Sequence, residues 1–541
     1  MTALTGTLRL LRLTIRRDRI VLTVWVVAIG LLMIASVASI AGLYPTAAER
    51  ERAAAFAAGN QLARAFDGPA SGTSVGALTM MEAFGVLAVL VGLMSMLTVT
   101  RHTRQDEETG RAELLGSAVI GHHARLSAAL LLTLGANLVL ATTITLVLVG
   151  QGLPGEGALA AGAALGGVGL SFTAIAAVTA QVAATQRAAN GLAGAMLGLA
   201  FLLRAVGDAA GEVAPSGVEL VSAWPSWLSP IGWGQQVRPF GGDRWSVLWL
   251  FALLVAAMIA LAFVLNERRD LDGALLATRP GPPSARGRLR TPWRLAWRLQ
   301  RSMVIAWTVG IALLAGVLGG IGDGAEELAG LSDELAAAFE QMAVDGTLLD
   351  AYIAFVMGIA GIAAAGFTVQ SVLRARGEEA SERLEPLLAT AVSRPRWLAA
   401  NTLLAVAGAT IVLGAAGLAA GVAYGLATGD HIGGLTAFVT AGAVQVPAAL
   451  LLGGVVLAAF GLMPRVAAGV GWGLLAASFA LGQLGELLGL PQGVMNLSPF
   501  THVPAVPAEG FTVTPMLILL AVATALAAVG FLGFRRRDVV M

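Results

Sequence analysis

Two short charged blocks are the parts of this sequence whose residue types and spacing could do chemistry. The first block contains Glu107 and Arg111, and the second repeats them as Glu379 and Arg383, 272 residues further on. Residues four apart lie on the same side of a helix, so each glutamate can pair with its arginine there. A Leu-Leu pair at the end of each block predicts a short amphipathic helix that docks on a soluble partner. A solvated loop with stabilising ion pairs is the alternative, and the repetition of the pattern favours docking.

Catalytic chemistry finds no support in the residue types. The chain contains no cysteine, and all 34 of its basic residues other than histidine are arginine. It therefore has no thiolate nucleophile or thiolate metal site, and it lacks the lysine of a phosphate-binding P-loop. The glycine-rich segment at 152–157 does not match such a loop, and the five histidines have no metal-binding spacing. We expect a non-catalytic chain with no cofactor or metal of its own and no nucleic-acid partner.

Membrane-spanning helices are the elements that must position the two blocks. Of the 541 residues 57% are hydrophobic and only 12% are charged, with a mean hydropathy of +0.79, whereas soluble domains carry about 25% charge. Apolar runs long enough to cross a bilayer occur at 20–43, 78–100, 126–149, 158–184, 190–207, 246–266, 302–321, 350–373, 398–427, 434–461, 467–489 and 514–534. Such runs are too long for barrel strands, so the sequence predicts an all-α polytopic membrane protein with twelve transmembrane helices.

The two halves of the chain repeat one another. Arginines and a tryptophan near the first span recur 282 residues later; they are Arg12, Arg16, Arg19 and Trp25, followed by Arg294, Arg298, Arg301 and Trp307. Because six spans per half is an even number, the halves are expected to be parallel six-helix repeats. We expect domains at 1–270 and 293–541, joined by a cytoplasmic linker at 271–292. Each arginine triplet suits a helix that lies at the lipid headgroups before the first span.

The arginines also predict the orientation in the membrane. With a cytoplasmic N-terminus, 28 of the 34 arginines fall on the cytoplasmic side, as the positive-inside rule requires. The six exceptions are Arg50, Arg52, Arg64, Arg204, Arg238 and Arg244. We therefore expect a multi-pass protein of the plasma membrane, in contact with membrane lipid, with both termini in the cytoplasm.

Four ionisable residues fall inside predicted spans, where charges are costly and often functional. They lie toward the outer ends of these spans and are Glu82, Arg204, Asp208 and Glu486. Either they line a substrate pathway or gate, or they form a structural clamp in the outer headgroup zone, and the structural role is favoured. We expect Arg204 to pair with Glu486 across the halves. Proline-rich segments before the sixth and twelfth spans either fold back into the outer leaflet as an exit gate or form exposed loops.

These features together resemble a known family. A charged helix after the second span, six spans per half, an arginine-rich helix before the first span and a terminal Arg-Asp are similar to the permease subunits of ABC-2-type exporters. The stretch SPIGWGQQVRPFGGDRW at 229–245 resembles the long actinobacterial permeases described as exporters of polyketide antibiotics, including tetronasin-type and mycobacterial multidrug efflux members. The resemblance implies a separate ATPase subunit, which holds ATP and Mg²⁺ and binds one permease chain in two copies. It also implies ATPase-coupling helices, whose residues here are Glu107, Glu108, Arg111, Glu113, Glu378, Glu379, Arg383 and Glu385.

Several functions remain open from the sequence. The first is the permease of an ATP-driven exporter that moves hydrophobic or amphipathic drugs and antibiotics out of the cell. A second is a multidrug transporter driven by an ion gradient, with Glu82, Asp208 or Glu486 as proton sites. A related alternative is an ABC-2 exporter of a lipid or cell-envelope component. A membrane enzyme acting on lipid would need a catalytic cluster in a loop, and the sequence contains none.

Overall fold

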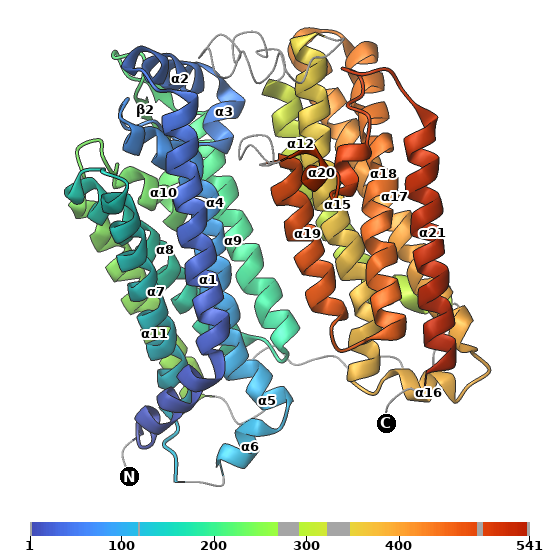
Figure 1. Cartoon of the computed structure of the whole chain (residues 1–541). Helices are drawn as coiled ribbons and strands as arrows, with labels where there is room; N and C mark the ends of the chain where they lie inside the picture. The colour runs from blue at the N-terminus through green and yellow to red at the C-terminus, as the bar shows by residue number, and fades with distance from the viewer. Residues whose placement is uncertain (1–2, 117–118, 269–290, 322–346, 484–490, 538–541) are drawn as a thin grey trace. The chain divides into compact units, whose positions relative to one another are not determined.

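The computed structural model describes residues 3–116, 119–268, 291–321, 347–483 and 491–537. The chain divides into two compact units, Met1–Gly281 and Pro282–Met541, and each is described by itself. Each unit is a bundle of long apolar helices (Figure 1). The architecture is therefore that of an all-α polytopic membrane protein, as the hydropathy pattern predicts.

Six helices of the first unit are long and apolar enough to cross a membrane. They are α1 (Thr7–Leu43), α4 (Val75–Thr100), α7 (Ala124–Gly150), α8 (Gly155–Val182), α9 (Gln186–Ala209) and α11 (Leu248–Glu267). Helices α4 and α8 form the centre of the bundle, because 72% of their most apolar windows is buried, whereas only 17% is buried in α11. A long apolar helix with little burial is suited to contact with lipid.

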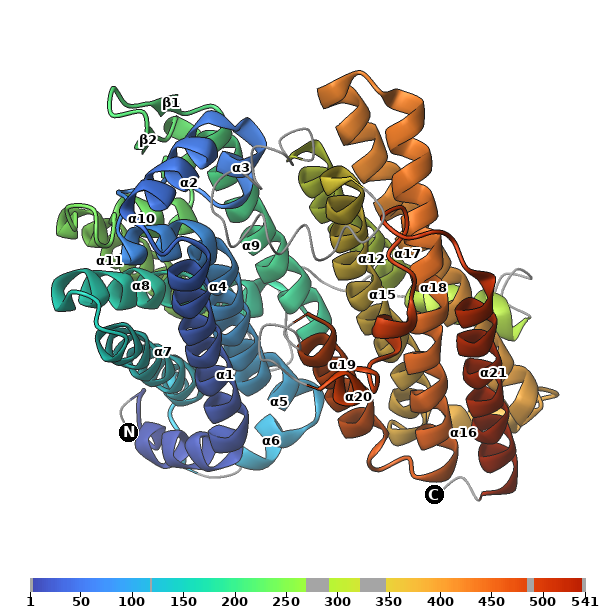
Figure 2. The same ribbon diagram turned by 45° about the horizontal axis from the view of Figure 1, so that its top comes forward.

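Shorter elements cover the end of the first unit away from the N-terminus (Figures 1 and 2). They are α2 (Ala47–Gly59), α3 (Gln61–Phe66), the antiparallel strands β1 (Glu212–Val213) and β2 (Leu220–Val221), η2 (Trp224–Leu228), α10 (Pro230–Gln236) and η3 (Trp245–Val247). A capping box starts α2, since Thr46 accepts the Glu49 N–H and Glu49 accepts the Thr46 N–H. Every residue of α10 except Trp233 is buried. This proline-rich segment therefore folds into the unit.

In the second unit, five described helices are long and apolar enough to cross a membrane. They are α12 (Pro292–Ile321), α15 (Leu348–Ala380), α17 (Arg394–Thr428), α18 (His431–Leu462) and α21 (Val513–Arg536). The remaining described elements are α16 (Leu384–Leu388), α19 (Ala467–Gln483), α20 (Gln492–Met495) and η6 (Pro499–His502). Among the described residues the number of spanning candidates is thus 11 rather than twelve.

The difference lies in the predicted eleventh span at 467–489. Helix α19 is apolar and has 17 described residues, ending at Gln483, and the rest of that predicted span lies outside the described part. The count of twelve, the parallel repeat and the domain boundaries at 270 and 293 therefore stay predictions.

The arginine triplets do not form separate helices at the headgroups. Arg12, Arg16 and Arg19 belong to the first turns of α1, which runs without a break to Leu43. The second triplet likewise belongs to α12. No proline or glycine separates Arg19 from the apolar run, so nothing in the sequence interrupts the helix. The arginine triplets are therefore the beginnings of α1 and α12, and their position at the headgroups stays a prediction.

Glycine pairs allow helices to approach closely in both bundles. A Cβ atom on Gly417 would lie 2.8 Å from the Phe438 carbonyl oxygen, and one on Gly421 would lie 2.6 Å from the Cα of Leu435. Helices α17 and α18 therefore meet backbone to backbone, as small residues four apart permit. At Gly198, by contrast, a Cβ atom would meet nothing within 4 Å among the described atoms, so that glycine has no packing role there.

Candidate functional site

The first charged block forms a bent segment beyond the end of α4. A π-helical turn, η1 (Arg101–Gln105), follows α4 and leads into α5 (Asp106–Glu108) and α6 (Arg111–Gly116). Gly110 turns the chain between α5 and α6 with a φ of +69°, a conformation that glycine adopts without strain. We name residues 101–114 the first elbow; in Figure 1 its helices α5 and α6 lie at the end of the unit where α1 begins.

Buried ion pairs attach the first elbow to neighbouring helices. Glu107 lies 2.9 Å from the Arg104 guanidinium and 3.6 Å from that of Arg125, at the start of α7. Arg104 is only 1% exposed and donates to the carbonyls of Ala180 and Gln181 near the end of α8. A charge with several hydrogen-bonding partners in a low-dielectric interior is held in one geometry. The elbow is thereby fixed to α7 and α8.

The expected pairing of Glu107 with Arg111 was wrong. Because the helix breaks at Gly110, the two side chains are not one helical turn apart, and Arg111 instead lies 3.6 Å from Asp106. Glu108 accepts the N–H of Gln186 at the first turn of α9, with a distance of 2.7 Å. Arg111 and Glu113 are exposed, so the outer side of the elbow presents both signs of charge.

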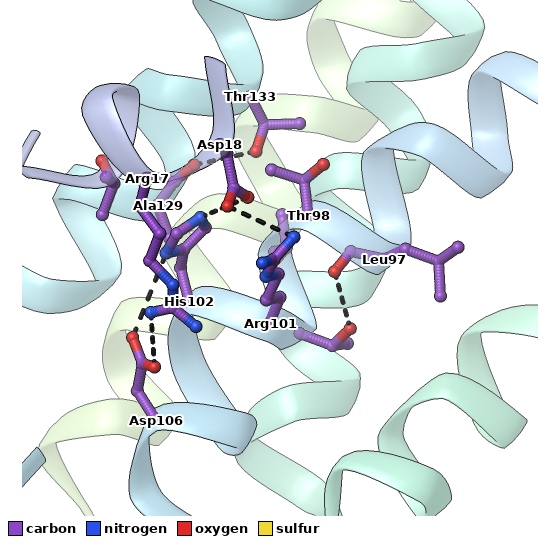
Figure 3. A network of polar contacts seen from close by, with 12 residues as sticks. Arg17, Asp18, Leu97, Thr98, Arg101, His102, Asp106, Ala129 and Thr133 are labelled. Carbon is purple, nitrogen blue, oxygen red and sulfur yellow. Dashed lines mark hydrogen bonds and ion pairs between the residues drawn. The ribbon is translucent and has the colours of Figure 1, made fainter. Parts of the chain in front are cut away.

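A polar network ties the first elbow to α1 (Figure 3). His102 and Arg101 both contact the buried carboxylate of Asp18, at 2.7 and 3.2 Å. The neighbouring Arg17 reaches Asp106 at 2.7 Å. Sequence reasoning missed these contacts, although an aspartate inside the arginine-rich run was a signal that it had an internal partner.

The second charged block is built differently. Helix α15 continues to Ala380, the chain turns at Glu382 with a φ of +57°, and α16 follows. We name residues 374–388 the second elbow. Glu378 lies between two arginines, 3.3 Å from Arg374 and 3.1 Å from Arg383. The expected pairing of Glu379 with Arg383 was therefore wrong, because the left-handed residue redirects the chain between them.

Glu379 instead binds an arginine that lies far away in the sequence, just after the last helix of the second unit. Both carboxylate oxygens of Glu379 accept hydrogen bonds from Arg537, each at 2.6 Å. The same guanidinium lies over the rings of Phe460 and Phe534, 5.0 and 5.3 Å from their centres. A bidentate pair of this kind is strong and directional. Arg383 and Glu385 remain exposed, with 62% of the Arg383 side chain accessible.

A second group of ionisable residues lies at the opposite end of the first unit. Arg204 and Asp208, one turn apart on α9, are both 0% exposed and approach to 3.5 Å. Arg204 also donates to the carbonyl of Phe66 and lies 4.5 Å from the centre of the Phe201 ring. The predicted pairing of Arg204 with Glu486 falls outside the described residues, and the ion pair that the structure describes for Arg204 is with Asp208.

Further carboxyls surround this ion pair. Burial raises the pKa of Asp67 to about 7, although the Arg204 guanidinium draws it down. Burial also raises the pKa of the Tyr44 phenol, and the nearby charges of Glu82 and Asp67 add to the effect. Sequence reasoning identified Glu82, Arg204 and Asp208 but missed Asp67, because it follows a short helix outside the apolar runs. The carboxyls of Asp67, Glu82 and Asp208 thus lie around the Arg204 guanidinium at this end of the first unit.

The segment 229–245 closes the first unit beside this group. Arg238, Phe240 and Asp243 all have positive φ angles, which non-glycine residues adopt only when their surroundings enforce it. Arg238 contacts Glu219 at 3.2 Å, and Asp243 accepts the Phe240 N–H at 2.9 Å. A Cβ atom on Gly76, in the first turn of α4, would lie 2.6 Å from the Phe240 ring. The ring therefore packs directly on the α4 backbone.

Two apolar helix bundles, with charged elbows and a buried ionic group, define an all-α polytopic membrane protein. Comparisons with known proteins make this specific. Residues 289–535 match the family described as "Multidrug efflux system permease Rv1217c, C-terminal domain". The chain is 42% identical over 536 residues to the multidrug efflux system permease protein Rv1217c of Mycobacterium tuberculosis, which covers 99% of this chain and 95% of that protein. The chain belongs to this family of multidrug efflux permeases.

Proposed function

We propose that this chain is the membrane subunit of an ATP-driven ABC-2-type exporter that moves hydrophobic or amphipathic drugs, polyketide antibiotics among them, out of the cell. Relatedness to a multidrug efflux permease supports drug export. The energy source is inferred from the two elbows, and a separate ATPase is proposed to bind them in two copies per chain. ATP and Mg²⁺ would be held by that partner, since this chain has no lysine for a P-loop.

The observation that carries the proposal is the construction of the elbows. Each elbow has an inner side held by ion pairs, through Glu107 in the first unit and Glu379 in the second. Each also has an exposed outer side with both signs of charge, supplied by Arg111 and Glu113 or by Arg383 and Glu385. A rigidly mounted, exposed charged helix can transmit the movement of a docked partner into the bundle, whereas a flexible loop would absorb it.

The same proposal assigns roles to the other candidate residues. Glu108 and Glu378 are assigned to coupling through the elbows they belong to, and the elbows face the cytoplasm together with both termini. Glu82, Arg204 and Asp208, with Glu486 from the segment that follows α19, are proposed to line the outer gate of the pathway. The twelve-span, two-repeat layout is part of the proposal, with α19 as the start of the eleventh span.

Reversal of the exposed elbow charges tests the docking step. Glu113→Arg and Glu385→Arg change outer side chains without touching the ion pairs that hold the elbows. Each is expected to lower the amount of co-purifying ATPase by about fivefold or more, because like charges across an interface are strongly unfavourable. Glu212→Arg, at an exposed position at the other end of the first unit, is the matched control. Binding that is unchanged in both elbow variants and in their combination would contradict the proposal.

A transport assay tests the energy source. Proteoliposomes containing permease and ATPase should accumulate a lipophilic drug with ATP while an ionophore collapses the proton gradient. The cluster of carboxyls around Arg204 favours one alternative, a transporter driven by protons, because carboxyls buried beside a guanidinium can exchange protons. Drug accumulation by the permease alone under an imposed proton gradient would establish that alternative. Stimulation of ATP hydrolysis by lipids rather than drugs would indicate export of a lipid or envelope component.

A further inference from the structure

An open groove lies on the first unit near the beginning of α1. Its volume is about 960 Å³, and it is lined by α7, α8, α11 and the residues around the start of α1. Its volume is at the upper end of the range for sites that hold small molecules. It shares none of its lining residues with the elbows or with the group around Arg204, so it belongs to neither site described above.

The groove is polar at one end and apolar along the rest of its length. Arg9 and Ser127, which lie in early turns of α1 and α7, line the polar end. Leu134 on α7 and Val255 on α11 line the apolar part. Leu134 follows Ser127 by seven positions, which is about 10 Å along the helix. Helix α11 runs along the groove in the same sense. Phe263 lies near its final turn, at the polar end, and Val255 lies two turns deeper, in the apolar part. The groove therefore has the polarity profile of an amphiphile aligned with the helices.

The polar end has donors suited to an anion. Helix α1 begins at Thr7 with no side-chain cap, and no acidic residue lies in its first turn. A helix of 37 residues concentrates partial positive charge at that end, and Arg9 adds a full charge beside it.

An unsatisfied hydroxyl inside the groove supplies an independent observation. Ser127 is 8% exposed, and its Oγ has no hydrogen-bond partner among the described residues. A buried hydroxyl without a partner is unfavourable by more than its hydrogen bond would contribute, so a ligand acceptor at this position is expected. Along α7 the serine comes about one turn or more before the groove-lining Leu130, Leu131 and Leu134, so it lies on the cationic side of the apolar part, the place of the ester carbonyls in a phospholipid.

We propose that this groove binds one anionic phospholipid of the surrounding membrane. The phosphate lies at the start of α1 and Arg9, the Ser127 hydroxyl donates to an ester carbonyl, and an acyl chain lies along Leu134 and Val255. The exposed rim favours lipid over a transported compound, since Leu8 and Leu131 are 77% and 41% exposed and are suited to contact with hydrocarbon. The inference does not depend on the energy source proposed for transport.

Native mass spectrometry of the purified full-length permease tests the site. The protein is equilibrated with equal amounts of dioleoylphosphatidylglycerol and dioleoylphosphatidylcholine, and the lipid that stays bound is counted for each headgroup. Arg9→Gln should lower the preference for phosphatidylglycerol by about fivefold, the ratio that corresponds to one arginine near an anionic surface. Arg12→Gln, an exposed arginine on α1 outside the groove, is the matched control and should leave the preference unchanged.

Filling the groove provides the second arm of the test. Leu131→Trp on α7 and Val255→Trp on α11 should each remove the retained lipid of both headgroups, whereas Leu138→Trp, at an exposed position of α7 outside the groove, should not. Two variants on different helices keep the test valid if one fails to fold, which gel filtration would show. Equal retention of both lipids by the unmodified protein, or losses no larger than in the controls, would overturn the proposal.

Discussion

The first helices of the two units carry different polar chemistry at matching positions. Asp18 in α1 and Gln300 in α12 are 282 residues apart, the same interval as the arginine triplets, and each is 1% exposed. Asp18 is charged and contacts His102 and Arg101. Gln300 is neutral; it donates to Asn401 at 2.9 Å and accepts from Ser371 at 2.8 Å. One unit therefore uses ions where the other uses neutral hydrogen bonds.

Both elbows are held by ion pairs, but they differ in the number of helices that hold them. The first elbow is held by several helices that follow it in the chain, since Arg104 and Glu108 reach α8 and α9. The second elbow is held chiefly by one bidentate contact, between Glu379 and Arg537 at the end of α21. Removing one member of a buried ion pair leaves an uncompensated charge, whereas a lost neutral hydrogen bond leaves only a weaker dipole unsatisfied. We therefore expect the first unit to depend more strongly on its charges than the second.

Arg204→Met should have the largest effect on stability. It leaves the carboxylate of Asp208 buried without its ion pair, at a cost of about 3–5 kcal/mol in the free energy of unfolding. Unfolding of the purified permease in increasing dodecyl sulfate, followed by tryptophan fluorescence, measures the loss. The double variant Arg204→Met/Asp208→Leu should recover at least half of it, because no buried charge of the pair remains. A double variant less stable than the single one would show that the pair is not the cause.

Asp18→Ala should be the next most damaging change, by about 3 kcal/mol, because His102 and Arg101 both lose their carboxylate. The same unfolding assay applies, and Arg19→Gln, at the adjacent exposed position, is the control. Asp18→Asn keeps a hydrogen-bond acceptor and should lose less. If Asp18→Ala were no worse than Arg19→Gln, the ionic network would contribute nothing.

Gln300→Ala sharpens the comparison directly. It leaves Ser371 and Asn401 without their shared partner, which corresponds to about 1–3 kcal/mol for buried neutral groups. The loss should be smaller than that of Asp18→Ala in the same assay. Equal losses would show that charge is not what distinguishes the two units.

Asp67→Asn is the one change expected to stabilise the protein rather than destabilise it, and its effect should depend on pH. Burial raises the pKa of Asp67 to about 7 from its ordinary value of 3.8, so the folded state binds the proton more tightly than the unfolded state. Stability from this group is therefore full below the ordinary pKa and is lost as pH rises through the raised one. The variant should be more stable than the unmodified protein at pH 8, by up to about 4 kcal/mol because the two pKa values differ by roughly three, and the two proteins should match only at about pH 4. A difference that is the same at both pH values would contradict the assignment.

The sequence predicted the local features of this protein well. Eleven of its apolar runs are helices of spanning length, because hydropathy and chain length decide whether a segment can satisfy its backbone in lipid. The positions of both elbows followed from the repeated charged blocks. The pairing within the elbows did not, since single left-handed turns at Gly110 and Glu382 redirect side chains that simple helical spacing would bring together.

By itself, the sequence determined that this is a polytopic membrane chain without a P-loop lysine. Both properties depend only on which residues are present and how apolar each segment is, and not on which helices pack together. Only the tertiary structure decided which charges meet. Glu379 finds Arg537 at a separation of 158 residues, and Asp18 finds His102 at a separation of 84. Such pairs depend on which helices pack together and at what height, and a periodicity that repeats every turn carries no information about either.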